Sequence, residues 1–190
     1  MSLPRFNEES YCHFITTKTF RNKRIFRDER CREITLHDVD FYRKKIGFKL
    51  LGYCIMADHV HMIVWWNTDE KPELTISKIM HDIKGASAKH LSDYFYPGGQ
   101  GLNALPGNKR GIQAPPTLHN GIPTRYGIKI WQSSFYDFNI YSDKKFREKL
   151  NYIHWNPVRA GLCTKPEDWQ WSSCRFYEFG EPGTLHIDTI

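Results

Sequence analysis

The amino-acid sequence predicts an α+β protein whose core is a ferredoxin-like βαββαβ unit, a four-stranded antiparallel sheet with two helices on one face, followed by an added C-terminal helix. Three observations lead to this prediction. Stretches rich in β-branched and aromatic residues alternate with stretches whose apolar residues recur at helical spacing. Two of the strand-like stretches are separated by only a short break, as in a hairpin. A chain of 190 residues is long enough for one domain that contains all of these elements.

The first half of the chain supplies three strands and two helices. Residues 11–17 are predicted to form a strand, and residues 28–46 a helix in which charged residues separate spaced apolar ones. Residues 48–56 and 59–66 are the second and third strands, with Ala57 and Asp58 forming a tight turn between them. Residues 75–95 give the clearest helix. Its apolar residues at helical spacing are Ile76, Ile79, Met80, Ile83, Ala86 and Leu91.

The second half supplies a strand over residues 128–140, with or without a bulge, and a helix over 143–158 that Asp143 caps or biases. Residues 97–127 contain seven glycines and five prolines, which indicates a flexible insertion. Arg110 in this insertion is a candidate phosphate contact, although a segment without a specific role fits equally well. Residues 160–190 form a C-terminal tail. Residues 1–190 are therefore predicted to be a single domain.

Composition narrows the class of protein. The formal net charge is +6, and 12 Phe, 10 Tyr and 6 Trp are present, which together favour a nucleic-acid partner although charge alone does not decide it. Five scattered cysteines without a Cys-x-x-Cys pair argue against a zinc ribbon and a disulfide framework. No apolar run approaches the roughly 20 residues of a membrane span, and the first residues lack the apolar region of a signal peptide. We expect a cytoplasmic protein without a membrane partner.

A pair of histidines on the third strand is the first candidate site. Successive strand side chains point to opposite faces, so His59 and His61 share a face while Val60, Met62 and Val64 take the other. Two neighbouring imidazoles can hold a divalent metal if a further ligand is supplied elsewhere. At this spacing alone, packed or surface histidines are the plainer interpretation.

The last helix carries a second pair. Tyr152 and Asn156 are four residues apart, so they share a helix face at the edge of the apolar stripe. An Asn carbonyl is an acceptable ligand for Mg²⁺, and a tyrosine hydroxyl can act as a covalent nucleophile. Taken singly, Tyr152 could be a packing residue, and Asn156 could end the helix because it precedes Pro157.

Together these residues resemble a known family. The His-x-His strand, a tyrosine four residues before an Asn, and the phrase YIHWNPVRAGL at 152–162 are similar to single-tyrosine HUH transposases. The closest similarity is to the REP-associated tyrosine transposases, relatives of small insertion-sequence transposases. It covers about residues 11–88 and 130–177. Further similar stretches are FRD at 26–28, LGYCIM at 51–56, WQ at 131–132, PEDW at 166–169 and WSS at 171–173. The chain departs from the family at Ala57-Asp58, where Pro-Asn is usual, and in the long 97–127 segment; we expect neither to touch the proposed ligands.

The resemblance implies an enzyme that cleaves and rejoins hairpin-containing single-stranded DNA. Tyr152 would be the nucleophile that forms a 5′-phosphotyrosine, and His59, His61 and Asn156 would hold Mg²⁺ or Mn²⁺. The protein would act as a monomer or a homodimer. The candidate DNA contacts are Lys84, Lys145, Lys149 and Arg110. For Lys84 alone, a solvated helix face is the plainer interpretation, and Lys145 or Lys149 could instead help to ionise the tyrosine.

Two other hypotheses compete with this enzyme. One is a catalytically silent DNA-binding protein of the same fold. The other is an unrelated His-x-His metal enzyme such as a cupin or a phosphodiesterase, but a cupin needs many strands and further His or Glu ligands. The presence of both histidines, the tyrosine and the asparagine favours the enzyme over the silent binder.

Overall fold

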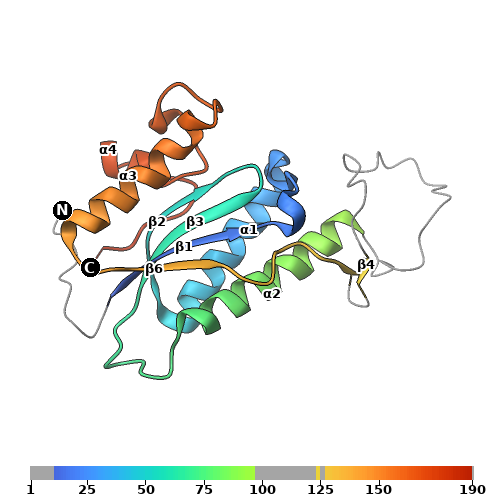
Figure 1. Ribbon diagram of the computed structural model, residues 1–190, viewed down its shortest axis with the longest axis horizontal. Coiled ribbons are helices and arrows are strands. Elements are labelled where there is room, and N and C mark those ends of the chain that lie inside the picture. The colour runs from blue at the N-terminus through green and yellow to red at the C-terminus, as the bar shows by residue number, and fades with distance from the viewer. Residues whose placement is uncertain (1–10, 97–122, 125–126, 190) are drawn as a thin grey trace.

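The computed structural model describes residues 11–96, 123–124 and 127–189 (Figure 1). Four strands form the central sheet, in the order β2-β3-β1-β6, and every neighbouring pair is antiparallel. The strands are β1 (Cys12–Lys18), β2 (Lys49–Ile55), β3 (His59–Trp65) and β6 (Tyr136–Ile140). Two short strands, β4 (Pro123–Thr124) and β5 (Gly127–Ile128), pair separately. The observed sheet confirms the predicted α+β, ferredoxin-like class. Most of the 97–127 segment, Arg110 included, lies outside the described residues.

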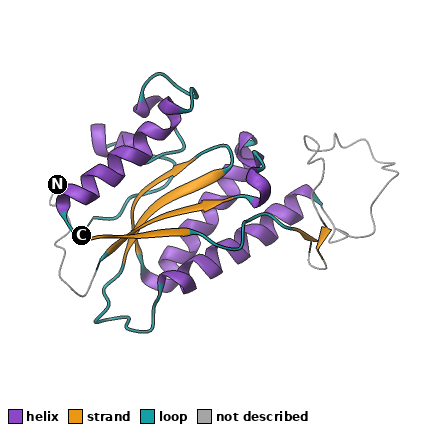
Figure 2. Cartoon of the chain, in the orientation of Figure 1, coloured by secondary structure: helices purple, strands orange, loops and turns teal. Residues whose placement is uncertain are grey.

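Helices α1 (Glu29–Tyr42) and α2 (Ile76–Phe95) cover one face of the sheet (Figure 2). Each begins at a side-chain cap, because the Asp28 carboxylate accepts from the backbone N–H of Arg30, and the Thr75 hydroxyl accepts from that of Lys78. A π-helical turn, Arg43–Gly47, continues α1, so the helix predicted over 28–46 changes its winding after Tyr42. The main core lies between these helices and the sheet residues that face them.

Helix α3 (Asp143–Arg159) lies on the opposite face of the sheet. Its cap is Ser142, and Asp143 lies in the first turn, where its charge favours the helix start as the second of the two predicted roles requires. This helix contributes Phe146 and Ile153 to a second buried apolar cluster, which also contains sheet residues such as Phe14. Gly52 on β2 permits the close approach, since a Cβ there would lie 2.9 Å from Leu150 Cδ1 and 3.3 Å from Ile153 Cδ1.

The fourth strand is shorter than the predicted 128–140. Before Tyr136, the backbone leaves the ladder between β1 and β6 and pairs instead with the turn that follows β1. In this pairing the Phe20 N–H donates to the Ile130 carbonyl at 2.7 Å. The Lys84 ammonium then donates to the carbonyl oxygens of residues 132, 133 and 134 at 2.7, 3.1 and 3.3 Å. Trp131 is buried and donates from Nε1 to the Ser87 hydroxyl at 3.0 Å. Helix α2 therefore holds this segment.

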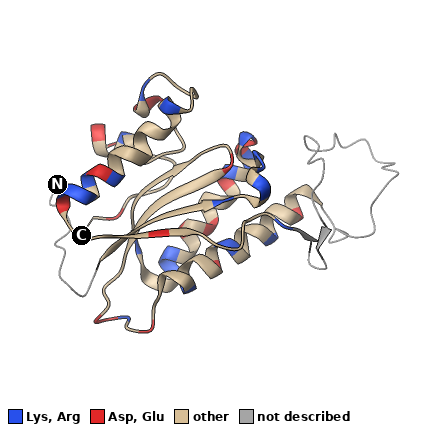
Figure 3. Ribbon diagram, in the orientation of Figure 1, with Lys and Arg blue, Asp and Glu red and all other residues tan. Residues whose placement is uncertain are grey.

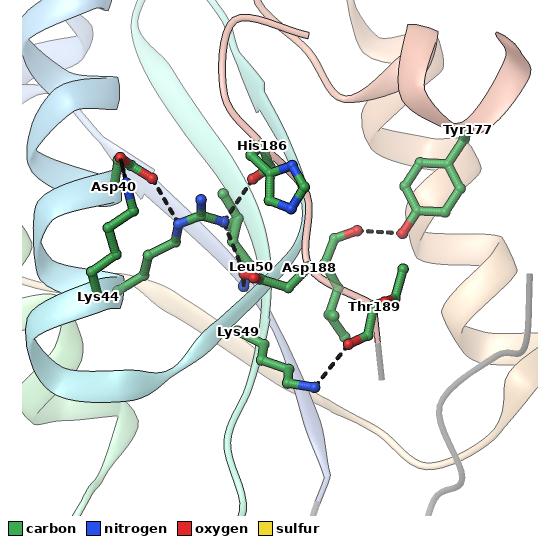
Figure 4. A network of polar contacts seen from close by, with 10 residues as sticks. Asp40, Lys44, Lys49, Leu50, Tyr177, His186, Asp188 and Thr189 are labelled. Carbon is green, nitrogen blue, oxygen red and sulfur yellow. Dashed lines mark hydrogen bonds and ion pairs between the residues drawn. The ribbon is translucent and has the colours of Figure 1, made fainter. Parts of the chain in front are cut away.

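The C-terminal tail covers the free edge of β2. After the 3-10 turn Pro166–Asp168, backbone hydrogen bonds join β2 to residues 171, 173 and 188. Helix α4 (Cys174–Phe179) lies in sequence between the second and the third of these residues. The Arg43 guanidinium donates to the His186 carbonyl at 2.6 Å and to the Asp188 carboxylate at 2.8 Å, and that carboxylate also accepts from Leu50 N–H (Figure 4). The tail thereby satisfies backbone groups that an edge strand would otherwise expose. Across the described ranges, no helix has the length and apolarity that crossing a membrane requires.

Candidate active site

The two histidines of β3 face helix α3. The ring centroids of His59 and His61 are 4.7 Å apart, and the rings are almost perpendicular at 82°. His61 is 2% exposed, while the side chain of His59 retains 20% exposure. The predicted shared face is therefore present, with one ring buried beneath the helix and the other at the rim of the site.

Each imidazole is held through its Nδ1 atom. His59 Nδ1 lies 2.6 Å from Asp58 Oδ1, and His61 Nδ1 lies 2.8 Å from Thr16 Oγ1. Thr16 is the β1 residue directly opposite His61 in the ladder. When Nδ1 carries the proton donated to these oxygens, the lone pair of each ring is on Nε2, the arrangement typical of metal-binding histidines.

The expectation that Ala57-Asp58 would stay clear of the ligands was wrong. The Asp58 carbonyl accepts from the Thr19 N–H at 2.9 Å and from the Thr19 hydroxyl at 3.0 Å, which fixes the turn between β2 and β3. In that fixed turn the Asp58 carboxylate lies against the ring of the next residue, His59.

The electrostatics of the site favour a neutral His61. Burial, with smaller contributions from the nearby His59 and Lys18, lowers the pKa of His61 from 6.5 to about 3. A neutral imidazole with a free Nε2 is the form that binds a metal.

Helix α3 brings the other two predicted residues to the same place. Asn156 Nδ2 lies 2.8 Å from His61 Nε2, and the Tyr152 ring centroid lies 5.5 Å from that of His61 at an angle of 77°. Tyr152 is 42% exposed, so a substrate can reach it. The four predicted residues of one chain thus come together, with the pair on β3 and the pair on α3 meeting at His61.

Residues 7–100 match the family model described as "Transposase IS200 like". The match covers 94 of the 190 residues and agrees with the resemblance inferred from the sequence motifs.

The chain is also similar to one curated protein and to two solved structures. A Haemophilus influenzae protein provisionally named REP-associated tyrosine transposase is 41% identical over 44 residues, which are 23% of this chain and 25% of that protein. The match therefore spans only a quarter of the curated relative. A solved structure described as a REP-associated tyrosine transposase bound to a REP hairpin has a TM-score of 0.63 and 16% identity, covering 100% of this chain and 92% of that one. That likeness shows a shared fold. A structure from Deinococcus radiodurans, provisionally described as a transposase, has a TM-score of 0.48 and 18% identity over 80% of this chain and 95% of that one.

The candidate site includes residues that the motifs did not reveal. The Phe14 ring lies nearly parallel to that of His61, with centroids 5.6 Å apart, and meets the Tyr152 ring edge-on at 5.9 Å. Phe14 and Thr16 are two residues apart on β1, so their side chains share a face of the strand. Only the strand register shows that this face is the one beside His61. Arg159 Cζ lies 5.6 Å from the Tyr152 ring centroid. Its spacing of seven residues, two helical turns, was a usable signal for this contact.

The predicted DNA-contact lysines lie in different settings. Lys149 Nζ is 5.0 Å from the Phe14 ring centroid and 4.5 Å from that of Phe138, so it stands beside the ring that also contacts the tyrosine. Lys145 pairs with the Glu148 carboxylate at 2.7 Å on the helix surface. Lys84 is held by the three carbonyl oxygens that fix the segment before β6.

The donor set can be compared with what a divalent ion needs. In the part of the chain that the structure describes, no group of three or more His, Cys, Asp or Glu residues could hold a metal. The available set is instead two imidazole nitrogens and the Asn156 amide. A half-turn of that amide exchanges its nitrogen and oxygen, which would present the oxygen at the same position. Two imidazole nitrogens with an amide oxygen, with positions left for water or phosphate oxygens, suit Mn²⁺ and are acceptable to Mg²⁺.

Proposed function

We propose that this protein is a metal-dependent transposase that cleaves and rejoins hairpin-containing single-stranded DNA through a 5′-phosphotyrosine at Tyr152. The observation that carries the proposal is the placement of Tyr152 and Asn156 against His61 within one chain, at a ring distance of 5.5 Å and an atomic distance of 2.8 Å. The match to the family model supports the reaction class. A structural neighbour described as bound to a REP hairpin supports the form of the DNA.

The reaction is an exchange of phosphodiester bonds. The Tyr152 hydroxyl oxygen attacks phosphorus, the Oη–P bond forms, and the bond from phosphorus to the 3′ oxygen breaks. The phenol proton passes to solvent, and the departing 3′ oxygen takes up a proton. The 5′ strand end stays on the tyrosine, so a second 3′ hydroxyl can attack it and release the phenol without an external energy source.

Side chains around the tyrosine suit the charge that develops in this step. Two basic side chains, Arg159 and Lys149, flank the region of the Tyr152 and Phe14 rings. They can bind the phosphate oxygens and stabilise negative charge on the attacking oxygen. Phe14 limits the positions that the Tyr152 ring can take.

His59 and His61 through Nε2, and Asn156 through its amide oxygen, would hold Mg²⁺ or Mn²⁺. Such an ion, when bound, would withdraw electron density from the scissile phosphate and offset the negative charge that builds up there. Asp58 and Thr16 orient the two imidazoles from behind. Because the nucleophile and these ligands belong to one chain, we propose that a single chain carries a complete site, whether it acts as a monomer or within a homodimer.

The test is a covalent-adduct assay. Labelled hairpin-bearing single-stranded DNA is incubated with the protein and Mn²⁺ or Mg²⁺, and the product is separated under denaturing conditions. Tyr152→Phe should abolish the adduct while DNA binding persists. Tyr136→Phe is the matched control, because Tyr136 is also exposed and also meets the Phe14 ring edge-on, yet it should leave the adduct intact.

The opposite results separate the hypotheses. An adduct that survives Tyr152→Phe refutes the nucleophile. DNA binding by the wild-type protein without any adduct supports the silent binder. Replacing His59 and His61 together by Ala should abolish cleavage, and unchanged cleavage would refute the metal site.

A further inference from the structure

One short segment carries most of the net positive charge of the chain. Residues 18–27 contain no acidic residue and have a formal charge of +5, out of +6 for all 190 residues. Its basic residues are Lys18, Arg21, Lys23, Arg24 and Arg27. Among the described residues, none of the five lies within 4.0 Å of a carboxylate, whereas Lys44, Lys78 and Lys145 are all paired with one. The segment is therefore a concentrated and uncompensated positive charge.

The segment is attached to the candidate active site. Lys18 is paired with His59 in the ladder between β1 and β3. Beyond Lys18, two 3-10 turns, Phe20–Asn22 and Ile25–Arg27, pack against the β2–β3 turn, because Phe26 N–H donates to the Ala57 carbonyl at 3.0 Å. Figure 3 shows the blue positions of this segment beside the end of the β2–β3 hairpin. A strand of DNA that enters the site at His59 passes next to these cations.

The backbone of this segment is strained at one of its basic residues, Arg21. Arg21 and Asn22 have φ angles of 56° and 53°, the left-handed region that glycine adopts most readily. Asn is tolerated there, but Arg is not a residue that this conformation favours. Arg21 is exposed, so packing does not explain its presence. An arginine kept at a position better suited to glycine suggests that its side chain has a function.

Lys23 adds an independent observation. Its Nζ atom is buried and has no hydrogen-bond partner within the described part of the chain. Burial lowers the pKa of this lysine, and Arg21 adds to the effect. An unpaired buried ammonium is unfavourable, and an incoming anion would satisfy it.

We propose that residues 18–27 form a phosphate-binding turn that holds the DNA backbone next to the scissile position. This proposal rests on the proposed function, because it assigns the site of contact for the same substrate. The exposed Lys18, Arg21, Arg24 and Arg27 would contact successive phosphates. Binding would depend on charge and not on base sequence, since phosphate contacts position the strand without reading it.

The experiment measures binding of a fluorescent single-stranded oligonucleotide by anisotropy at several salt concentrations. It uses the Tyr152→Phe background with EDTA, so that neither cleavage nor a metal is needed. For single strands the logarithm of affinity falls with the logarithm of salt by about 0.7 per phosphate contact. Arg24→Ala with Arg27→Ala should reduce this slope by about 1.4. Lys44→Ala with Lys78→Ala is the control, since it removes the same charge from cations that already have carboxylate partners, and it should leave the slope nearly unchanged.

Arg21→Gly gives a second and sharper test. Glycine adopts the observed φ without strain, so the thermal midpoint should stay the same or rise while the slope falls by about 0.7. A loss of DNA affinity without a loss of stability cannot come from misfolding. The proposal is overturned if Arg21→Gly and the Arg24/Arg27 double variant both bind with the wild-type slope, or if the control loses as much. If the wild-type protein itself binds no single-stranded DNA, the proposed function fails instead.

Discussion

Removal of the Asp58 carboxylate should weaken metal binding at the histidine pair. Asp58 Oδ1 lies 2.6 Å from His59 Nδ1, and the two side chains are 28% and 20% exposed. A hydrogen bond to a charged group contributes about 1.5–3 kcal/mol, and partial exposure places this one at the lower end. About 1.4 kcal/mol corresponds to a tenfold change in the dissociation constant. We therefore expect Asp58→Ala to weaken Mn²⁺ binding about tenfold, within the range known for residues that orient metal-binding histidines.

The chain offers a matched control for this prediction. Asp137 contacts His13 Nδ1 at 3.0 Å, and its side chain is also 28% exposed, but His13 stacks on Trp66 and does not contact the candidate site. Asp137→Ala should therefore leave Mn²⁺ affinity unchanged. Affinity is measured by isothermal titration calorimetry, with free Mn²⁺ followed by electron paramagnetic resonance. The reasoning is refuted if Asp58→Ala binds Mn²⁺ as tightly as the wild-type protein, or if Asp137→Ala weakens binding equally.

Three further predictions follow from the same geometry. Thr16→Val removes a neutral hydrogen bond worth about 0.5–1.5 kcal/mol from His61, so Mn²⁺ titrations should show a roughly two- to tenfold loss, and no loss would argue against a role for Thr16. Gly52→Val should destabilise the fold by about 1–3 kcal/mol in urea unfolding and also reduce adduct formation, since its side chain would meet Leu150 of the tyrosine helix; a fully active, stable variant would contradict this. In metal-free protein, His61 has a pKa of about 3 against 6.5 when unfolded, so the unfolded chain binds more protons between these values and stability falls as pH is lowered through them. His61 should contribute about 2 kcal/mol to the loss from pH 8 to pH 5 in urea unfolding, and buried His154, whose pKa is about 4, adds a similar contribution. His61→Gln should therefore lose about 2 kcal/mol less than the wild-type protein over this range; an equally steep profile in the variant would contradict the assignment.

The elements of this fold were predictable because their patterns are local. Alternation along residues 59–66 placed His59 and His61 on one face, and helical spacing placed Tyr152 beside Asn156. The strand predicted over 128–140 was too long because its first half pairs through contacts that no local pattern contains, among them the Lys84 ammonium on three carbonyl oxygens. The extent of that strand depended on a helix some 50 positions earlier in the sequence.

The supporting residues of the site were harder to predict for a related reason. Thr16 reaches His61 only because β1 and β3 pair in one particular register, and a shift by one residue would turn its hydroxyl to the other face. Asp58 is adjacent to His59 in sequence, but its carboxylate meets the ring only because Thr19 fixes the turn. Sequence motifs thus predicted the four side chains that the structure brings together, while the residues that orient the histidines depended on tertiary pairing.

Helix α3 couples the stability of the fold to the geometry of the site. Ile153 is fully buried against the sheet, while Tyr152 and Asn156 flank it in sequence and face His61. On a helix these side chains are rigidly related, so a rotation that moved Asn156 away from His61 would also lift Ile153 out of its apolar cluster. The absence of a side chain at Gly52 sets how closely the helix can approach. The packing that stabilises the helix is therefore the same packing that keeps the proposed nucleophile and the third candidate ligand over the histidines, and a change at the helix–sheet contact should alter both together.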